Sequence, residues 1–398
     1  MKNRTKKIYY ISPRDVRKNR ADAVHIMLSC QALSLLNIDV ELVTPSVLRD
    51  EYVVDKDSIF QLYGIENPKF KVTELNTNIS EVSSNKTKPY RIVLEKLKVF
   101  LSFGYKNRML LRSKETIIFS KCYISTMPFI ILKKLGLISS DIVFEAITPR
   151  DSIIHRIVYN NSDKIISHLK FVTEDILKFS KASRDKIFEP PFLTQSDEIE
   201  KIKESKLELR EELGIKATEF YILYAGKTGE KVRQVEYFIE AASKMPSLKF
   251  LIVGANEQAI KMYNKIKSER AISNLDIFPF QPLKEYYKYV IASDVLIGYY
   301  PATHHNKYHL SPGKLGVYFA SKNPCVFSDL PSLRSLFPDE ILFYAEPDNT
   351  SKLVESIQYI KDNPQIASKK AAAAFEFATI STYHNFVVGI VNFIDSGD

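Results

Sequence analysis

Residues 221–242 read YILYAGKTGEKVRQVEYFIEAA, and this stretch decides the fold class. An apolar run at Tyr221–Ala225 is followed by a glycine and a basic loop, and an amphipathic pattern then begins near Val235. A short apolar run that ends in a glycine and leads into a helical pattern is typical of a strand, a turn and a helix in a parallel sheet. The stretch therefore predicts one strand–helix unit, with its helix at Val235–Lys244.

The same alternation of apolar runs and helical patterns extends over most of the chain, which predicts α/β domains built on parallel sheets. Strands are expected at Ile8–Ser12, Val40–Thr44, Thr116–Ser120, Ile142–Glu145, Lys164–Ser167, Tyr221–Ala225, Lys249–Val253, Asp294–Tyr299 and Cys325–Ser328. Helices are expected at Ala21–Leu36, Pro149–Asn161, Glu198–Leu213, Val235–Lys244, Asn256–Lys267 and Pro312–Ser321.

The length of the chain, 398 residues, favours two domains over one. Pro190 and Pro191 predict the connection between them, because successive prolines interrupt regular structure. We therefore expect two doubly wound, Rossmann-like domains, at residues 1–195 and 196–380. Such folds bind ligands at the carboxyl ends of their strands, so the crevice between the domains is the expected site.

Composition and charge limit the compartment and the binding partners that we expect for this chain. The three cysteines, Cys30, Cys122 and Cys325, form no metal-binding or disulfide pattern, so we expect no metal site and a reducing compartment. No signal peptide and no run of about 18 apolar residues is present, which predicts a cytoplasmic protein, soluble or peripheral at the inner face of a membrane. The formal net charge of +9 suits an anionic partner: a nucleotide, a phospholipid surface or a nucleic acid.

The basic loop after the strand at 221–225 is a candidate anion site. Gly226 lets the backbone approach a ligand closely, and Lys227 and Arg233 carry charge that can neutralise a diphosphate. The alternative is an ordinary solvated basic loop.

A second stretch, residues 311–330, reads SPGKLGVYFASKNPCVFSDL. Ser311 is expected to cap a helix whose first turn contains Pro312. The free amides of that turn, together with Lys314, would form a second anion site. The alternative is an ordinary capped helix whose apolar residues pack in the core.

In order and spacing, the two stretches together resemble the donor domain of family 4 glycosyltransferases. Between them, FLIVG (Phe250–Gly254) and YYKYVIASDVLIGYYP (Tyr286–Pro301) are similar to the family's pattern. The segment NRADAVHIMLSCQALSLLNIDVELVTP, at residues 19–45, resembles its first strand, helix and second strand. The resemblance covers nearly the whole chain and is weakest over residues 50–110.

The resemblance implies the GT-B architecture, in which two Rossmann-like domains face each other across a cleft. It further implies a nucleotide-diphosphate sugar as donor, no cofactor, and metal-independent transfer with retention to a glycan or lipid-linked acceptor in cell-surface polysaccharide biosynthesis. The last segment, residues 381–398, resembles the helix that returns to the first domain in this family. The donor-binding residues that the resemblance implies are Gly226, Lys227, Arg233, Ser311, Pro312, Gly313 and Lys314.

The sequence departs from the family pattern at positions that contact ligand. His309 and Val317 occupy the positions of a paired-glutamate motif, and Ile147 occupies that of a histidine near the reacting sugar. Glu145 is the candidate catalytic residue, because a side chain at the carboxyl end of a strand faces the expected site. His25 and His309 are further candidates for the cleft.

Residues 86–114 read KTKPYRIVLEKLKVFLSFGYKNRMLLRSK and combine basic with apolar side chains. A helix here would suit an anionic membrane surface and a lipid-linked acceptor. The alternative is a helix that covers the sheet of the first domain. The apolar residues expected on one face are Ile92, Leu94, Leu97 and Phe100.

Three other functions are weighed against transfer of a sugar. A non-catalytic GT-B module, acting as partner subunit of another transferase, is favoured by Val317 and Ile147. Nucleic-acid binding is not expected, because it rests on net charge alone and no recognised motif supports it. An NAD-dependent oxidoreductase is not expected, because no GxGxxG follows a strand.

Overall fold

The computed structural model describes residues 6–17, 21–48, 59–80, 89–194, 199–228 and 235–396. The chain divides into two compact units, the first made of residues 1–191 and 383–398 and the second of residues 192–382. The division expected from the sequence falls after residue 195, with the last segment beginning at 381.

The first unit is built on a seven-stranded sheet with the strand order β3-β2-β1-β4-β5-β6-β7, in which all neighbouring strands are parallel. The order reverses between β1 and β4, which is the switch point of a doubly wound sheet. The elements are β1 (Lys7–Ile11), α1 (Ala21–Leu35), β2 (Asp39–Leu48), α2 (Ile59–Leu62), β3 (Lys71–Ser80), α3 (Pro89–Lys106), β4 (Thr116–Ser120), α4 (Tyr123–Lys134), β5 (Asp141–Ala146), α5 (Ile153–Asn161), β6 (Lys164–Ser167), α6 (Lys170–Phe179), β7 (Ile187–Phe188) and α17 (Tyr383–Asp395), with short 3-10 helices at Leu110–Arg112 and Arg184–Lys186.

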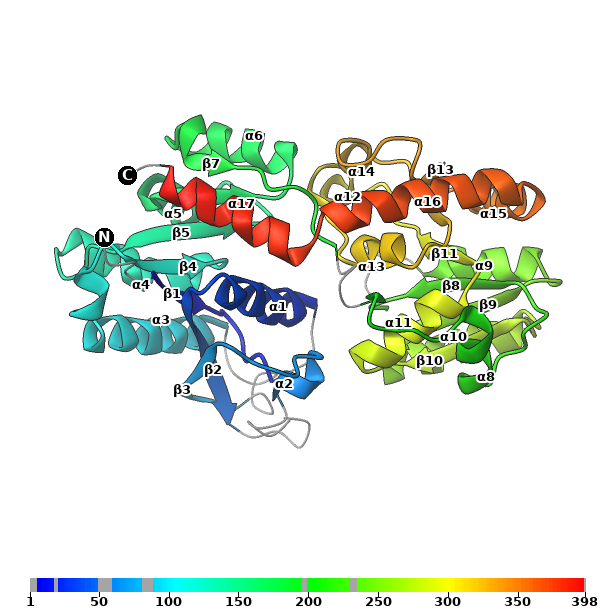
Figure 1. Ribbon diagram of the computed structural model, residues 1–398, viewed down its shortest axis with the longest axis horizontal. Helices are drawn as coiled ribbons and strands as arrows, with labels where there is room; N and C mark the ends of the chain where they lie inside the picture. Colours follow the sequence, from blue (N-terminus) through cyan, green and yellow to red (C-terminus); the bar gives the residue numbers. More distant parts are fainter. Residues whose placement is uncertain are drawn as a thin grey trace. The chain divides into compact units, whose positions relative to one another are not determined.

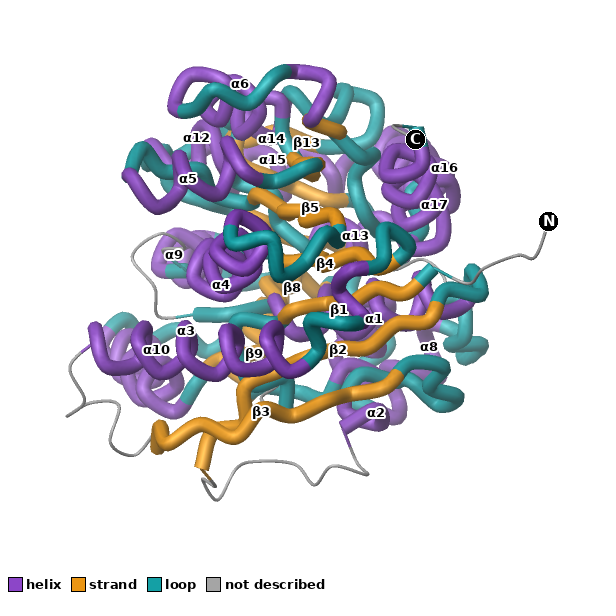
Figure 2. The backbone as a smooth tube through the Cα atoms, turned by 90° about the vertical axis from the view of Figure 1, so that its left-hand side faces the viewer, coloured by secondary structure: helices purple, strands orange, loops and turns teal. Residues whose placement is uncertain are grey.

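Helices cover both faces of this sheet. Figure 2 shows α3 and α4 on one face, and α1 and α17 on the other. The C-terminal helix α17, red in Figure 1, lies along α1 and buries Phe386, Val387 and Ile390. The end of the chain is thereby part of the first unit, because these apolar side chains are removed from water against α1.

The second unit repeats this architecture with a six-stranded parallel sheet, in the order β10-β9-β8-β11-β12-β13. Its switch point lies between β8 and β11. The elements are α8 (Lys206–Glu212), β8 (Tyr221–Ala225), α9 (Glu236–Lys244), β9 (Lys249–Ala255), α10 (Glu257–Glu269), β10 (Leu275–Pro279), α11 (Leu283–Ala292), β11 (Val295–Gly298), α12 (His304–His309), α13 (Lys314–Ala320), β12 (Cys325–Ser328), α14 (Pro331–Arg334), β13 (Phe343–Ala345), α15 (Thr350–Asp362) and α16 (Pro364–Ile380).

Both faces of the second sheet are buried, because alternate residues of each strand belong to different cores. Leu223 of β8 packs in one core with residues of α11, α13 and α16. Its neighbours Ile222 and Tyr224 pack in the other core with residues of α9, α10 and α15. The side chains of a strand alternate between the two faces of a sheet, so a strand buried on both faces is apolar throughout.

The expected strands are all observed, with small differences at their ends, but three helix predictions are wrong in part. The helix expected from Pro149 begins at Ile153 and has Ser152 as its N-cap. The charged helix expected over Glu198–Leu213 is not continuous: Glu198 lies outside the described residues, residues 200–205 are not helical, and α8 covers Lys206–Glu212, where Ser205 and Glu208 form a capping box. The helix expected from Pro312 begins at Lys314 and has Gly313 as its N-cap, so Ser311 is not the cap.

The predicted apolar face of the basic segment is also wrong in part. Within α3, Phe100 is buried and Ile92 and Leu97 are half-buried, but Leu94 is exposed. The helix packs on α4 and β3 and so covers the first sheet, as the alternative interpretation of this segment expects.

Within the described part of the chain, no single helix has the length and apolar composition needed to cross a membrane. One bent pair of consecutive helices, α16 and α17, meets those criteria only when taken together. Much of α17 is buried inside the first unit, as is common for a core helix.

Candidate functional site

The carboxyl ends of the strands in the first unit place a buried carboxylate, Glu145, near the switch point of the sheet. Glu145 lies on β5 and its side chain is 1% exposed. His25 Nε2 lies 2.8 Å and His168 Nε2 2.7 Å from Glu145 Oε1, while the Tyr10 hydroxyl donates to Oε2 at 3.1 Å. The Lys121 ammonium is 3.8 Å from Oε1. We call Tyr10, His25, Lys121, Glu145 and His168 the Glu145 cluster.

The electrostatics of the Glu145 cluster keep the carboxylate charged. Burial alone would raise the pKa of Glu145, but Lys121 and the hydrogen bonds from the two histidines outweigh it and hold that pKa well below its usual range. The pKa of His25 is lowered to about 4, mainly by burial and to a smaller extent by the charge of Lys121. At neutral pH the cluster therefore contains a charged Glu145 and an uncharged His25.

His25, Glu145 and His168 also have the side chains of a metal site, with ligand atoms that all lie within 4.8 Å of one another. The two nitrogen–oxygen distances are those of N–H···O hydrogen bonds. The ammonium of Lys121 already neutralises the carboxylate and would repel a second cation. The geometry therefore favours a hydrogen-bonded cluster in which Glu145 accepts from both imidazoles.

The helix α17 covers the Glu145 cluster with aromatic side chains. The ring of Phe386 is stacked on His168, with centroids 5.7 Å apart, and meets the edge of His25 at 5.8 Å. Tyr383 lies 6.1 Å from His25, centroid to centroid. The cluster thus joins the strand ends of the first sheet to α1 and to the C-terminal helix.

In the second unit, two glycines meet at the carboxyl ends of β8 and β9. Gly226 has φ +134° and Gly254 has φ +104°, and both values lie in the range that L side chains rarely adopt. A Cβ on Gly254 would lie 2.8 Å from the carbonyl oxygen of Gly226, so no side chain fits there. Glycine is therefore required at this edge of the sheet, where the backbones that end β8 and β9 come into close contact.

Lys314, the first residue of α13, brings a positive charge to the same edge. Its ammonium lies 3.8 Å from the centre of the Tyr224 ring and 5.3 Å from that of Tyr300. A Cβ built on Gly226 would be 3.6 Å from Lys314 Cε. The chain therefore places a cation directly beside the glycine at the end of β8, next to the switch point.

The other predicted donor-binding residues are spread over this edge. Lys227 is exposed, and its carbonyl accepts a hydrogen bond from the Tyr224 hydroxyl at 3.0 Å. Arg233 lies outside the described residues. Ser311 is half-buried, Pro312 buried and Gly313 exposed, all before the start of α13.

The predicted cleft residues have different surroundings. His309 is buried at the end of α12, where its ring faces those of His304 and His305 at 5.8 and 6.0 Å, whereas His25 belongs to the Glu145 cluster. Val317 lies in the core of the second unit, and Ile147 is exposed after β5.

Sequence reasoning missed His168 and Lys121, although the rule that selects Glu145 also selects them. His168 directly follows β6 and Lys121 directly follows β4, so both stand at carboxyl ends of strands. The signal was present, but nothing in the sequence shows that these strand ends converge on one carboxylate.

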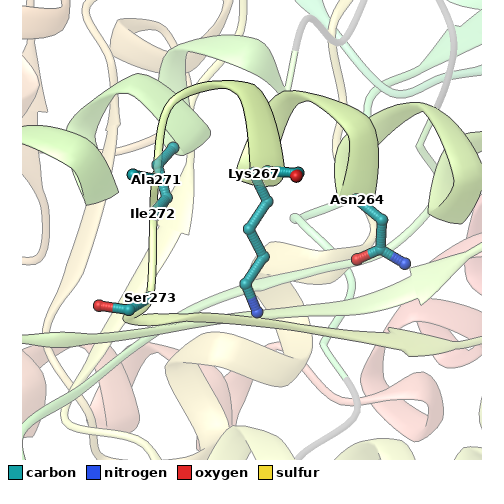
Figure 3. Close-up of a pocket in the computed structure, with 6 residues that line it drawn as sticks. Asn264, Lys267, Ala271, Ile272 and Ser273 are labelled. Atoms are coloured by element: carbon teal, nitrogen blue, oxygen red, sulfur yellow. The ribbon is translucent and has the colours of Figure 1, made fainter.

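Two surface hollows of the second unit are lined by none of the site residues that the sequence predicts. Figure 3 shows the first, of about 430 Å³, lined by Asn264, Lys267 and the segment 271–273 before β10. The second, of about 540 Å³, lies beside Lys244 and Ser247, before β9. Both are at the amino ends of strands, and ligands of doubly wound sheets bind at the opposite edge.

No family model matches the sequence, and no curated protein matches it. Among solved structures, a glycosyltransferase from Rickettsia africae is 14% identical with a TM-score of 0.71, covering 98% of both chains. Sucrose-phosphate synthase from Thermosynechococcus elongatus is 14% identical with a TM-score of 0.73, also covering 98% of both chains. HepE from Anabaena, solved with UDP and glucose, is 12% identical with a TM-score of 0.71, covering 98% of this chain and 100% of its own. At such identities the likeness is one of fold, and the fold of this chain is GT-B.

Proposed function

We propose that this chain is a glycosyltransferase that moves a sugar from a nucleotide-diphosphate donor to a glycan or lipid-linked acceptor in cell-surface polysaccharide biosynthesis. The observation that carries the proposal is the position of Lys314 beside Gly226, at the carboxyl edge of the second sheet. A cation next to a glycine at the carboxyl end of a strand, beside a switch point, is a suitable site for a diphosphate.

The chemistry of the reaction explains why this arrangement is useful. When the bond between the sugar and the phosphate breaks, negative charge develops on the leaving diphosphate. The ammonium of Lys314 and that of Lys227 can stabilise this charge, and they require no reorganisation if they are already in place. The proposed transfer is therefore metal-independent, and its retention of configuration is carried over from the resemblance to family 4.

The proposal is tested by a thermal-shift screen of the full chain against UDP, GDP, ADP, CMP and their common sugars. The screen starts with UDP, because HepE was solved with UDP and with UDP-glucose. We expect one nucleotide to raise the melting temperature, and expect Lys227→Ala and Arg233→Ala to abolish the shift. If no nucleotide shifts the folded protein, the donor site does not exist.

A second candidate function is a non-catalytic GT-B module that acts as the partner subunit of another transferase. It is favoured by Val317, which by the resemblance stands where a glutamate holds the donor ribose. Val317 is buried in an apolar core and offers no polar atom to a ribose hydroxyl. A chain of this kind would show no nucleotide-dependent shift in the same screen.

We further propose that α3 docks on an anionic membrane surface, which would bring the chain to a lipid-linked acceptor on the cytoplasmic side. Tyr90, Leu94, Leu101 and Tyr105 are between 39% and 59% exposed. Their spacings of four, seven and four residues place them on one face of the helix. Exposed cations flank this stripe at Arg91, Lys98 and Lys106. Each basic residue near an anionic surface contributes about 1 kcal/mol of binding.

Sedimentation with vesicles tests the docking. We expect the chain to sediment with vesicles that contain phosphatidylglycerol and to bind them less at high salt. It should not sediment with vesicles of pure phosphatidylcholine. Leu94→Glu should weaken this binding strongly. The matched control is Leu35→Glu, because Leu35 is similarly exposed but lies at the end of α1, on the other face of the sheet. Equal loss in both variants, or binding independent of lipid charge, would contradict the docking.

A further inference from the structure

The accessible parts of the Glu145 cluster are two imidazoles at the strand ends of the first unit. We propose that His25 and His168 bind the hydroxyl groups of an uncharged sugar acceptor, and that Glu145 holds the two rings in position. This inference rests on the proposed function, because it names the class of acceptor that the transferase uses.

The hydrogen bonds to Glu145 fix which nitrogen of each ring carries the proton. An ionised carboxylate accepts hydrogen bonds and cannot donate them, so His25 and His168 both donate from Nε2. A neutral imidazole with a proton on Nε2 has a lone pair on Nδ1. Neither Nδ1 accepts a hydrogen bond from the residues that the structure describes.

Exposure separates the groups that a ligand can touch from those that it cannot. The side chains of His25 and His168 are 16% and 15% exposed, whereas those of Glu145 and Lys121 are 1% and 5% exposed. A ligand at this edge would therefore meet the imidazoles, while the carboxylate and the ammonium stay beneath them. Glu145 is in this account a positioning residue and not a catalytic one.

The chemistry of the two rings selects the ligand. The ring centroids are 5.9 Å apart, so one sugar can reach both. A lone pair on Nδ1 accepts from an O–H group, but it offers nothing to a phosphate or carboxylate, whose oxygens are themselves acceptors. Four titratable groups surround the rings. Three of them, Tyr10, Lys121 and Glu145, belong to the Glu145 cluster, and the fourth, Tyr383 of α17, is buried beside His25. The site therefore suits a neutral polyol.

Two substitutions separate the roles of the ring nitrogens. In His168→Gln, the side-chain amide can still reach Glu145 from the position of Nε2, but the acceptor at the position of Nδ1 is lost. In His168→Asn, a polar atom remains near the position of Nδ1, but the bond to Glu145 is lost. If Nδ1 binds the acceptor, the glutamine variant should fold normally and bind sugar less tightly.

The experiment is nitrogen NMR of the full chain labelled with ¹⁵N-histidine, first alone and then with added sugars. Without ligand, we expect His25 and His168 to carry their protons on Nε2 at neutral pH, and Glu145→Gln to weaken that preference. The probes are glucose, galactose, mannose and N-acetylglucosamine, with glucose 6-phosphate and glucuronate as charged counterparts. At least one neutral sugar should shift both Nδ1 signals, and its dissociation constant should rise about five- to tenfold in His168→Gln. The exposed His384 of α17 provides the control, as His384→Gln.

Three results would overturn the inference: protons on Nδ1 of the two rings, Nδ1 signals that no neutral sugar shifts, or equal shifts with the charged sugars. A titration with Zn²⁺ tests whether the cluster binds a metal. A Zn²⁺-dependent shift of both Nε2 signals at stoichiometric metal would assign the cluster to a metal instead. The readout needs no nucleotide, so a failed donor screen would contradict the proposed function without changing this result.

Discussion

Replacing Arg210 by methionine is expected to lower the free energy of unfolding of the second unit by about 3 to 5 kcal/mol. Arg210 is 4% exposed, and its guanidinium donates to Asp294 Oδ2 at 2.6 Å. It also donates to the carbonyls of Ala292 and Ala217 at 2.9 and 2.8 Å. Removing the guanidinium leaves these carbonyls unsatisfied and the carboxylate of Asp294 with only one of its two cations, Lys206.

Urea denaturation followed by circular dichroism measures this loss, and hydrogen exchange at the amides of β8 and β11 assigns it to the second unit. The matched control is Arg334→Met. Arg334 is also paired with carboxylates, those of Asp329 and Asp339, but its side chain is 39% exposed. Exposed ion pairs contribute about 0 to 1 kcal/mol. Equal losses in the two variants would contradict the assignment of stability to the buried pair.

The first unit is expected to lose stability as the pH falls from 6.5 to 4. The pKa of His25 is lowered from its usual 6.5 to about 4 by burial and by Lys121. Between these values the unfolded chain binds a proton that the folded chain does not, so unfolding becomes easier as the pH falls. The full shift corresponds to a loss on the order of 3 kcal/mol. The lowered pKa of Glu145 acts in the same direction below its usual range of about 4.5.

Hydrogen exchange at the amides of α1 and α17, recorded between pH 4 and 7 and corrected for the intrinsic exchange rate, checks this expectation. The slope of stability against pH should be smaller in His25→Gln, which has no proton to gain in this range. His384→Gln should keep the slope of the natural protein, because His384 is exposed. A slope that is unchanged in His25→Gln would show that His25 is not responsible for the acid sensitivity.

The four strands that the sequence did not indicate, β3, β7, β10 and β13, are the edge strands of the two sheets. An edge strand has only one neighbour and is partly exposed, so its sequence need not be apolar. The segment of β3, KVTELNTNIS, is mostly polar for this reason, whereas central strands such as β4 are buried at every residue. The central strands were predictable because burial on both faces requires an apolar run.

From the sequence, a site residue could be predicted only where it stands at the end of a strand. Glu145 and Gly226 were selected because each stands at the carboxyl end of a strand. The partnership of Glu145 with His25, 120 residues earlier in the chain, could not be predicted, because it depends on how α1 packs on the sheet. The start of α13 was misplaced because Ser311 and Pro312 have the residue types of a helix start, whereas the helix begins at Lys314.

The most direct test of the proposed donor site is the dissociation constant of the nucleotide diphosphate selected by the screen, measured by calorimetry for the natural chain and two variants. In Lys314→Met the constant should rise about 10- to 100-fold, because a charged hydrogen bond contributes about 1.5 to 3 kcal/mol. In Lys322→Met it should not change. Lys322 also lies over an aromatic ring, that of Phe375 at 4.2 Å, but it follows the other end of α13. An unchanged constant in Lys314→Met, or an equal rise in both variants, would contradict a diphosphate site at the carboxyl edge of the second sheet.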